Sequence, residues 1–427
     1  MLVLAEAANP DWVSVPLIGW SLAEALRSVA DVHLVTQIRN RSAIAAQGWI
    51  EGQDFTAIDS EAIARPVDKI GNLIRGGSGK GWTILQALSS RLSYPYFERK
   101  VWQQFGAAIR RGDYDVVHRI TPVSPTANSS MASRCRKAGV PFILGPLNGG
   151  VPWPKGFDAE RRDENEWLSY IRDLYKLSPA RTRTLRDASV IITGSKHTLS
   201  EIPKVHQAKA LRIPENAIDP DRFNNVSDQN IDGPLRGCFV GRLVRYKGPD
   251  MLLDAAAGAL RAGQLTLDII GDGPMLDDLR AQADRLGIGD GVSFHGWLAH
   301  QDVQKILCQS NLLTFPSVRE FGGGVVLEAM ALGVVPVICD YAGPAELLTP
   351  NVGYAVPLGT RDEIVARFSE QLDTIISDPS VLPAMGRRAQ EIVAQTYTWH
   401  QKAKQIRTLY DWVKRPGDSP LPRPFAT

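Results

Sequence analysis

The stretch from residue 311 to residue 340 constrains the fold more than any other part of the chain. Two short apolar runs, at residues 311–315 and 334–339, have the length and composition of buried strands. Between them, Leu327 and Met330 lie at helical spacing, and Gly333 stands where such a helix would end. When a helix connects two strands of one sheet, the two strands run parallel and form a βαβ unit. The stretch therefore predicts an α/β fold built on a parallel sheet.

The same alternation of short apolar runs and helical patterns occurs twice along the chain, which predicts two doubly wound α/β units. A polar stretch at residues 224–234 separates the two series, so we place the boundary near residues 205–230. The length of 427 residues independently favours two domains, of roughly 200 residues each. Strands are expected at residues 2–5, 32–35, 116–117, 142–144 and 190–193 of the first unit, and at residues 237–240, 265–270, 292–294, 312–315 and 335–338 of the second.

The composition is that of a globular protein and argues against several classes of function. Hydrophobic residues make up 44% of the chain, and the formal net charge is only +2, so no strong field favours a nucleic-acid partner. The four cysteines are far apart and fit no zinc site, which indicates free thiols in a reducing compartment. No apolar run reaches the length of a membrane span, and no signal-peptide pattern follows Met1. We therefore expect a cytoplasmic protein.

Residues 61–112 differ from their surroundings in charge. They contain nine Lys or Arg residues against three Asp or Glu residues. Such a basic segment could lie on the inner face of a membrane or bind a charged acceptor. The alternative is an ordinary pair of helices with a solvated basic side. The segment also holds six aromatic residues: Trp82, Tyr94, Tyr96, Phe97, Trp102 and Phe105.

Two carboxylates flank the glycine-rich turn of residues 311–340. Glu320 lies in the loop after the first strand, and Glu328 lies on the first turn or so of the helix. Between them, the backbone N–H groups of Gly323, Gly324 and Val325 would lack intrahelical partners and would carry the positive end of the helix dipole. A polyhydroxylated anion suits this place, because carboxylates accept hydrogen bonds from hydroxyls. The alternative is an ordinary strand-to-helix turn with solvated glutamates.

Two cations are expected at the same edge of the second sheet. A strand ends at Gly241, and the loop after it carries Arg242 and Lys247. Arginine can bind a phosphate with two parallel hydrogen bonds, and lysine supplies a point charge, so the pair could hold a diphosphate. Ligands of open α/β sheets bind along the carboxyl edge of the strands. A basic surface loop without a ligand is the alternative.

Two further loops follow strands at this edge. Gly271 and Gly273 belong to a Gly-Asp-Gly-Pro turn, which alone fits a structural turn as well as a ligand contact. Trp297 follows the next strand, where backbone groups could contact a base. No strand is followed by the Gly-x-Gly-x-x-Gly spacing with a later acidic residue, so a dinucleotide site of the Rossmann type is disfavoured.

In order and spacing, these motifs resemble the retaining glycosyltransferases of family 4, the glycosyl transferases group 1. The resemblance covers residues 236–400 and is weaker before them. It implies the GT-B fold, an α/β architecture of two facing Rossmann-like domains with parallel sheets, in which a C-terminal helix packs back on the N-terminal domain. The motifs that carry it are Gly241-Arg242-Leu243, Lys247-Gly248, Gly271-Asp272-Gly273-Pro274, Gly296-Trp297, and Glu320 with Glu328 after seven intervening residues.

The resemblance also implies how the chain is divided. Residues 1–210 would bind the acceptor and residues 211–395 the nucleotide-sugar donor. Residues 396–415 would form the returning helix, and residues 416–427 would be a tail. Members of the family retain the anomeric configuration and need no metal ion or other cofactor. We therefore expect a UDP- or GDP-sugar as the donor and no metal site.

Positions matching the family's motifs suggest a role for each residue. Arg242 and Lys247 would bind the donor diphosphate, and Glu328 the ribose hydroxyls. Glu320 would lie near the transferred sugar, and His118, which ends a strand-like run of the first unit, would lie over that sugar. We count Glu320, His118, Arg242 and Lys247 as catalytic candidates. The donor site would also include Gly241, Gly271, Gly273, Trp297, Gly323, Gly324 and Val325.

Acceptor contacts are expected at Gly19, Asn148 and Gly149 of the first unit. They rest on weaker grounds than the donor residues. The first strand is followed by residues 6–10, Glu-Ala-Ala-Asn-Pro, where the family has a turn of two glycines.

The sequence thus predicts a retaining, metal-independent glycosyltransferase that uses a nucleoside-diphosphate sugar. Its acceptor would be a saccharide or lipid-linked saccharide in the assembly of cell-surface polysaccharide, lipopolysaccharide or glycolipid. One alternative is a nucleotide-sugar epimerase or a phosphorylase on the same fold, and another is a non-catalytic nucleotide-sugar-binding protein. Release of UDP or GDP only when an acceptor is present would exclude the epimerase. The presence of Glu320, Glu328, Arg242 and Lys247 argues against the non-catalytic protein.

Overall fold

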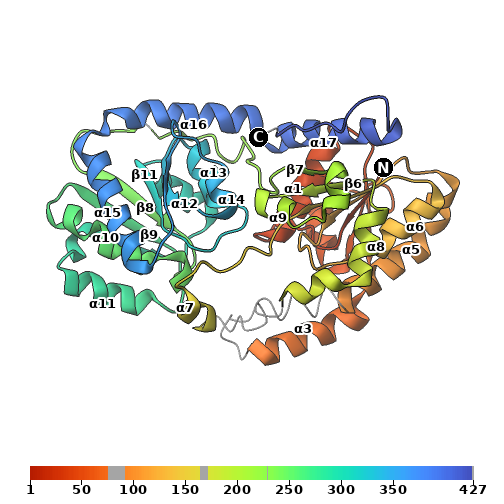
Figure 1. The fold of residues 1–427 in the computed structure, drawn as a ribbon, viewed down its shortest axis with the longest axis horizontal. Coiled ribbons are helices and arrows are strands. Elements are labelled where there is room, and N and C mark those ends of the chain that lie inside the picture. Colours follow the sequence, from red (N-terminus) through yellow and green to blue (C-terminus); the bar gives the residue numbers. More distant parts are fainter. Residues whose placement is uncertain (76–91, 164–171, 228, 426–427) are drawn as a thin grey trace. The chain divides into compact units, whose positions relative to one another are not determined.

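The structure is a computed structural model that describes residues 1–75, 92–163, 172–227 and 229–425 (Figure 1). The chain forms two compact units. The first comprises Met1–Gly150, Arg161–Glu215 and Trp399–Thr427, and the second comprises Val151–Glu160 and Asn216–Thr398. Each unit is built on its own parallel sheet.

The sheet of the first unit has the order β3-β2-β1-β4-β5-β6-β7, and all its strands are parallel. The apolar runs predicted as strands all lie in this sheet. The strands β3 and β7 were not predicted, because they are short edge strands without a continuous apolar run. The bounds are β1 Leu2–Ala5, β2 His33–Gln37, β3 Phe55–Ile58, β4 Val117–Thr121, β5 Phe142–Leu147, β6 Val190–Thr193 and β7 Ala210–Arg212.

Helices cover both faces of the first sheet, and the alternation of strand side chains divides its core in two (Figure 1). Val3 and Ala5 face the side of α1 and α17, while Leu2 and Leu4 face the side of α5, α6 and α8. The helices of this unit are α1 (Val15–Leu26), α2 (Arg41–Ala46), α3 (Glu61–Arg75), α5 (Tyr94–Arg111), α6 (Ser130–Ala138), α8 (Pro179–Asp187), α9 (Lys196–Ser200) and α17 (Trp399–Lys414).

The last helix, α17, returns to the first unit and packs against α1 (Figure 1). Its buried residues Ile406, Leu409, Tyr410 and Val413 recur at spacings of three and four, so they form one apolar stripe. This stripe belongs to the core that α1 shares with the sheet. The predicted return of the C-terminal helix to the N-terminal unit is confirmed.

The sheet of the second unit has the order β10-β9-β8-β11-β12-β13, again all parallel. Its strands are β8 (Leu235–Val240), β9 (Leu265–Ile270), β10 (Val292–Gly296), β11 (Leu312–Phe315), β12 (Val335–Cys339) and β13 (Tyr354–Val356). Its helices are α10 (Pro249–Arg261), α11 (Leu276–Leu286), α12 (His300–Leu307), α13 (Gly324–Ala331), α14 (Ala342–Ala345), α15 (Arg361–Ser377) and α16 (Leu382–Thr396), and α7 (Asp158–Asp163) lies where the chain passes back to the first unit.

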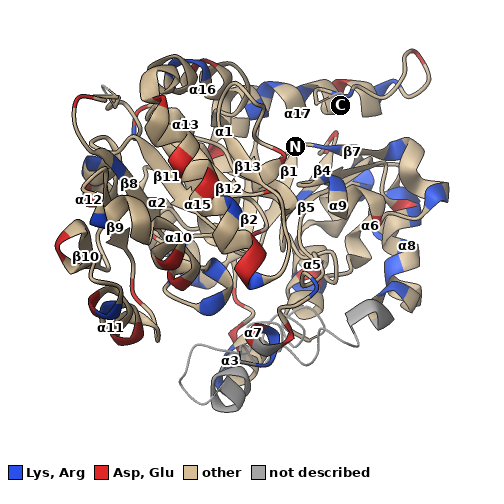
Figure 2. Ribbon diagram, turned by 60° about the vertical axis from the view of Figure 1, so that its left-hand side comes forward, with Lys and Arg blue, Asp and Glu red and all other residues tan. Residues whose placement is uncertain are grey.

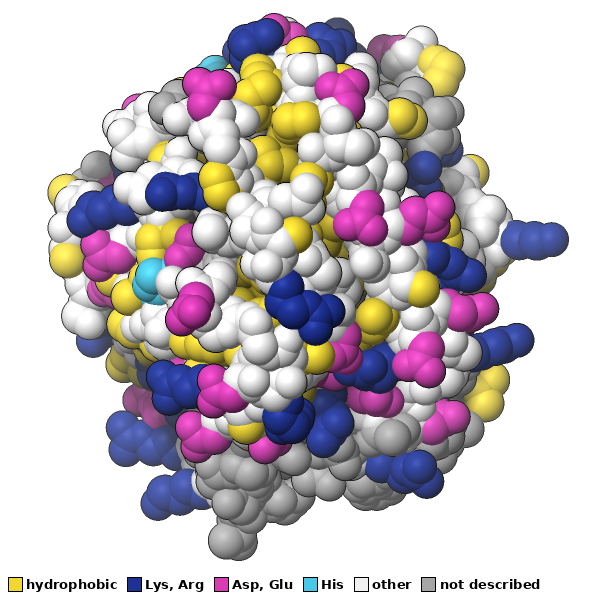
Figure 3. Space-filling view, turned by 90° about the vertical axis from the view of Figure 1, so that its left-hand side faces the viewer, with side chains coloured by type: hydrophobic (Ala, Val, Ile, Leu, Met, Phe, Trp, Pro, Cys, Tyr) yellow, Lys and Arg dark blue, Asp and Glu magenta, His cyan; other side chains and the backbone are white. Residues whose placement is uncertain are grey.

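Charged residues of both signs are interspersed over the surface. Figure 2 shows basic and acidic positions distributed along the ribbons of both units. The face seen in Figure 3 likewise carries Lys or Arg side chains next to Asp or Glu side chains. None of the helices in the described residues is both long and apolar enough to span a bilayer.

The basic, aromatic segment 61–112 is described at residues 61–75 and 92–112, and Trp82 lies outside the described residues. Tyr94, Phe97 and Phe105 belong to the core beneath α5, so their rings are unavailable to a membrane surface. Trp102 is half-buried on the same helix, and two guanidinium groups lie 5.3 Å from its ring centroid, those of Arg110 and Arg134. The described part of the segment therefore supports the alternative interpretation, an ordinary helix with a solvated basic side.

Candidate functional site

Three loops at the carboxyl edge of the second sheet are held together by backbone hydrogen bonds. The N–H of Gly241, after β8, donates to the carbonyl of Ile270 at 3.0 Å. The N–H of Gly271, after β9, donates to the carbonyl of Gly296 at 2.8 Å. These bonds bring the ends of β8, β9 and β10 together at the edge where ligands of parallel sheets bind.

Two predicted donor residues, Gly271 and Gly273, are glycines for a reason that involves no ligand. A Cβ on Gly271 would lie 1.9 Å from the carbonyl oxygen of Gly241, and the φ of Gly271 is +138°. A Cβ on Gly273 would lie 2.4 Å from the carbonyl oxygen of Leu243. Both positions therefore require glycine for the packing of the loop after β9 against the loop after β8.

The loop between β8 and α10 carries both predicted cations. Arg242 is exposed, and among the described residues its guanidinium has no hydrogen-bond or ion-pair partner. Lys247 lies further along this loop, which ends where Gly248 adopts a φ of +74° and Pro249 begins α10. Of the two cations, Arg242 is thus open to an incoming anion, while Lys247 is already engaged.

The partner of Lys247 is Glu320. The ammonium of Lys247 donates to Oε2 of Glu320, and the two side chains are only 15% and 22% exposed. The other oxygen, Oε1 of Glu320, accepts the N–H of Phe321 at 3.1 Å. The ring centroid of Phe315 lies 5.1 Å from the lysine nitrogen and adds a cation–π contact. The structure therefore joins two residues that the sequence predicted for separate parts of the site.

A second cation, Arg319, lies next to Glu320 in sequence and is surrounded by aromatic rings. Arg319 is buried, and its guanidinium carbon lies 4.7 Å from the ring centroid of Trp153 and 5.4 Å from that of Phe321. Trp153 in turn meets Tyr246 edge-on, with ring centroids 5.9 Å apart. The stacking holds the loop of Glu320 against residues of two other segments, and sequence reasoning did not single out Arg319 or Trp153.

The helix α13 begins directly after this loop, as predicted. Gly323 precedes its first residue with a φ of +61°, and the N–H groups of Gly324 and Val325 belong to the first turn, where no intrahelical carbonyl is in reach. Glu328 follows one turn later on the same helix. The positive end of the helix dipole and the carboxylate of Glu320 thus lie within one loop.

Glu328 has a partner that the sequence did not reveal. Nε2 of His300, the first residue of α12, lies 3.2 Å from Oε1 of Glu328. The other ring nitrogen, Nδ1, lies 3.2 Å from the amide nitrogen of Gln304. The sequence around residue 300 does not indicate that His300 contacts Glu328, because this contact depends on how α12 and α13 pack.

Trp297 lies in the loop after β10 and is 76% exposed. A large aromatic side chain with this exposure has most of its face available to another ring. The position is compatible with the predicted base contact. Among the described residues, no group of three or more His, Cys, Asp or Glu side chains is arranged to hold a metal ion.

His118, one of the predicted catalytic residues, has internal partners in the first unit. The side chain is fully buried in β4, and both ring nitrogens have internal partners. Nε2 lies 2.7 Å from the carbonyl oxygen of Gly145, and Nδ1 lies 2.7 Å from the hydroxyl of Tyr410. Because a carbonyl only accepts, the proton is on Nε2, and Nδ1 accepts from Tyr410. His118 is a core histidine that ties α17 to the sheet.

Two of the predicted acceptor residues, Gly19 and Asn148, pack or form hydrogen bonds inside the first unit. A Cβ on Gly19 would lie 2.1 Å from the carbonyl oxygen of Ala7, so this glycine lets α1 pack against the backbone after β1. The side chain of Asn148 is buried, its amide donates to Glu215, and its Oδ1 accepts from Ser195 at 3.0 Å. The packing at Gly19 and the side chain of Asn148 thus serve the interior of the first unit, and their contact with an acceptor stays a prediction.

Gly149, the third predicted acceptor residue, is half-buried, whereas Gly19 and Asn148 are buried. The φ of Gly149 is +131°. Its N–H donates to Oδ1 of Asn148 at 2.9 Å.

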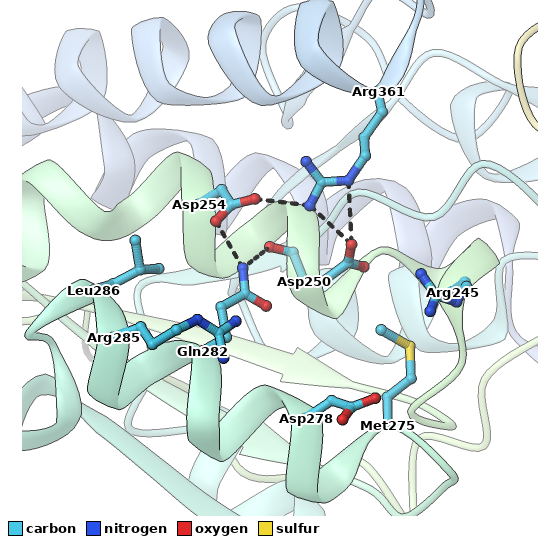
Figure 4. Close-up of a pocket in the computed structure, with 9 residues that line it drawn as sticks. All are labelled: Arg245, Asp250, Asp254, Met275, Asp278, Gln282, Arg285, Leu286 and Arg361. Atoms are coloured by element: carbon cyan, nitrogen blue, oxygen red, sulfur yellow. Dashed lines mark hydrogen bonds and ion pairs between the residues drawn. The ribbon is translucent and has the colours of Figure 1, made fainter.

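A cavity of about 330 Å³ lies away from these residues, among α10, α11 and the start of α15 (Figure 4). The guanidinium of Arg361 pairs with Asp250 at 2.9 Å and Asp254 at 2.7 Å, and Gln282 also donates to Asp254. These pairs tie the three helices together. The wall residues are Arg245, Asp250, Asp254, Met275, Asp278, Gln282, Arg285, Leu286 and Arg361, which include none of the predicted site residues.

Comparison with known proteins identifies the family. Residues 221–392 match the family described as Glycosyl transferases group 1. An uncharacterized glycosyltransferase of Methanocaldococcus jannaschii is 31% identical over 311 residues, which cover 70% of this chain and 75% of that protein. The lipopolysaccharide core biosynthesis glycosyltransferase LpsE of Rhizobium meliloti is 25% identical over 243 residues, covering 55% of this chain and 69% of LpsE.

Solved structures show the same fold. HepE of Anabaena, in complex with UDP, superposes with a TM-score of 0.64 at 18% identity, covering 95% of this chain and 97% of HepE. This likeness confirms the predicted GT-B fold with two Rossmann-like domains. With the sequence relatives it leads to one conclusion: the chain belongs to the Glycosyl transferases group 1 family, the retaining glycosyltransferases that use nucleotide-sugar donors.

Proposed function

We propose that this glycosyltransferase moves a sugar from a UDP- or GDP-sugar to a saccharide or lipid-linked saccharide of a cell-surface polysaccharide, lipopolysaccharide or glycolipid. One observation carries the proposal. Lys247, Glu320 and the N-terminus of α13 lie together at the carboxyl edge of the second sheet, where a sugar diphosphate meets cations, a carboxylate and free N–H groups.

Each part of the donor has a partner in this arrangement. Arg242 and Lys247 bind the diphosphate, since guanidinium and ammonium groups are the usual ligands of phosphate oxygens. Glu328 binds the ribose hydroxyls, and Gly241 and Trp297 lie beside the base. In this proposal the N–H groups of Gly323, Gly324 and Val325 lie beside the transferred sugar and its phosphate. Gly271 and Gly273 contribute by shaping the loop.

The same cations act on the reaction rate. Breaking the bond between the anomeric carbon and phosphate leaves an oxocarbenium-like sugar and a nucleoside diphosphate whose negative charge grows. Arg242, Lys247 and the dipole of α13 meet that charge where it develops, so they stabilise the transition state more than the bound substrate. In this scheme the protein needs no metal ion to neutralise the leaving group.

The geometry of Glu320 favours a front-side attack over a covalent intermediate. One carboxylate oxygen is paired with Lys247, and the other accepts the N–H of Phe321. In the donor-free structure, hydrogen bonds to both oxygens lower the nucleophilicity of this carboxylate. We therefore propose that the acceptor hydroxyl attacks on the face of the departing phosphate, whose oxygen takes the proton.

The biological setting rests on the relatives. LpsE is named for lipopolysaccharide core biosynthesis, and HepE was crystallised with UDP. These names support a cell-surface acceptor and a uridine donor for this protein.

The donor is tested with a thermal-shift panel of UDP, GDP, ADP and dTDP, with and without EDTA. A ligand at 100 times its dissociation constant adds about 2.7 kcal/mol of stability, so an occupied site gives a clear shift. We expect one diphosphate to stabilise the protein and the shift to survive EDTA. Absence of a shift with all four would contradict the proposed donor site.

A matched pair of variants shows where the diphosphate binds. Arg242→Ala should abolish most of the shift, because this exposed guanidinium is proposed to grip the phosphate. Arg285→Ala removes an exposed cation of the same unit, on the wall of the separate cavity, and should leave the shift intact. Equal losses in both variants would indicate non-specific attraction of the anion.

A further inference from the structure

We propose that His300 and Gln304 are positioning residues for the donor. They hold the carboxylate of Glu328 in the orientation that accepts the ribose hydroxyls. The inference rests on the role proposed above for Glu328, and it adds two residues that neither the family motif nor the sequence pattern singles out.

The three side chains form a chain of hydrogen bonds between two helices. His300 is the first residue of α12, and Gln304 lies one turn later, so the spacing of four puts them on the same face. The amide nitrogen of Gln304 lies 3.2 Å from Nδ1 of His300. Nε2 of His300 lies 3.2 Å from Oε1 of Glu328, on α13.

The chemistry of the three side chains determines which group donates and which accepts in each hydrogen bond. The amide nitrogen of Gln304 only donates, so Nδ1 of His300 accepts. A neutral imidazole that accepts at Nδ1 carries its proton on Nε2, and that proton points to Oε1 of Glu328. Gln304 thereby selects the tautomer of His300 that can hold a carboxylate.

In this series of hydrogen bonds, Gln304 is buried and held rigidly, while Glu328 is accessible to a ligand. Gln304 is buried, and the ring of Phe223 meets the imidazole at 90° with centroids 5.3 Å apart. Glu328 keeps 26% of its side chain exposed. Within the described residues, Oε2 of Glu328 has no hydrogen-bond partner. One oxygen is therefore held by the protein, and the other is available to a ligand.

This arrangement prepares Glu328 for a diol. A free glutamate side chain loses rotamer freedom when it binds, which weakens binding. The bond from His300 restrains the carboxylate before the donor arrives. Removing the imidazole should therefore weaken the ribose contact in particular and leave the contacts to base and diphosphate unchanged.

The test compares a nucleoside diphosphate that has the ribose hydroxyls with one that lacks them. The probes are UDP and 2′,3′-dideoxy-UDP, or the guanosine pair if GDP gives the larger thermal shift, with dissociation constants from isothermal titration calorimetry. His300→Ala should weaken UDP about tenfold, the effect of losing one hydrogen bond to a charged group. Binding of the dideoxy compound should not change. Gln304→Leu should act in the same direction, and His300→Gln should retain part of the preference because its amide can still donate.

The controls separate this inference from the role of Glu328. If Glu328→Ala abolishes the preference for UDP but His300→Ala leaves it intact, the positioning role is overturned and the ribose contact stands. If Glu328→Ala itself leaves the preference intact, the proposed ribose contact fails. Gln282→Ala changes a residue of α11 and removes its hydrogen bond to Asp254 of α10, so it should leave both dissociation constants unchanged. An equal loss for both nucleotides in His300→Ala would indicate general disruption and would also overturn the inference.

Discussion

The ammonium of Lys247 is bonded to the carboxylate of Glu320, although 73 residues separate them in the chain. The pair joins the loop after β8 to the loop after β11, two neighbouring strands of the second sheet. With most of both side chains buried, each charge neutralises the other in the absence of a donor. An incoming diphosphate would therefore compete with Glu320 for Lys247, so the pair couples the diphosphate to the carboxylate proposed to lie near the sugar.

This coupling predicts a non-additive effect on stability. Lys247→Met and Glu320→Gln should each destabilise the protein, because each leaves a largely buried charge without its partner, by about 1–3 kcal/mol. The double variant removes both charges and should lose less than the sum of the single variants. Urea unfolding of the four proteins measures the interaction. Strict additivity would show that the ion pair does not form in solution.

The buried histidine predicts a decline of stability in acid. Burial lowers the pKa of His118 from 6.5 to about 4. Between these values the unfolded chain binds a proton and the folded chain does not, so the contribution of His118 is complete above pH 6.5 and is lost as the pH falls toward 4. The difference between the two pKa values corresponds to about 3 kcal/mol.

His118→Gln should flatten this dependence. The measurement is the free energy of unfolding from urea curves between pH 7 and pH 4.5. The variant is expected to be less stable at pH 7, since it disturbs the bonds to Gly145 and Tyr410, but to change less on acidification. His400→Gln, which removes an exposed histidine of α17, is the control. An unchanged slope in His118→Gln would mean that this histidine titrates normally.

The strands were predictable where both faces of the sheet are covered. Leu2–Ala5, Leu265–Ile270 and Leu312–Phe315 have the predicted bounds, because helices on both faces favour continuous apolar runs. The edge strands Phe55–Ile58 and Tyr354–Val356 were missed. They are short, and in each of them some residues remain partly exposed, so their sequences do not differ from those of loops.

The site was predictable only as far as it is local. Glu320 and Lys247 lie in loops that follow strands, and Glu328 lies on the helix after the loop of Glu320, as the local sequence predicted. Their partners depend on which loops meet in space, and for this reason the bonds of Lys247 to Glu320 and of His300 to Glu328 were not foreseen. The contact of His118 with Tyr410 was not foreseen for the same reason, because the position of His118 on a strand does not reveal that α17 returns to cover it.

The packing of Gly271 predicts a large cost for the smallest side chain. In Gly271→Ala the new methyl group would overlap the carbonyl of Gly241, in a backbone conformation that disfavours any side chain. We expect a loss of about 3 kcal/mol in urea unfolding. Gly263→Ala is the matched control in the same unit: its φ is +66°, but no atom lies within 4 Å of the added carbon. It should cost about 1 kcal/mol. Equal costs for both would show that conformation alone, and not the contact with Gly241, requires glycine at residue 271.

A buried lysine at the end of the first unit predicts that stability rises with pH above neutrality. Lys402 is fully buried in α17, its ammonium donates to the carbonyl of Pro214, and burial lowers its pKa from 10.5 to about 7, against the opposing effect of Glu215. Between these values the unfolded chain holds the proton that the folded chain has released. The free energy of unfolding should therefore increase with pH, by at most about 1.4 kcal/mol per pH unit.

Lys402→Met should remove this increase between pH 7 and pH 9, while Lys404→Met, which changes an exposed neighbour, should keep it. If the slope of Lys402→Met matches that of the wild type, the lysine keeps its proton in the folded protein and is stabilised there by the carboxylate of Glu215.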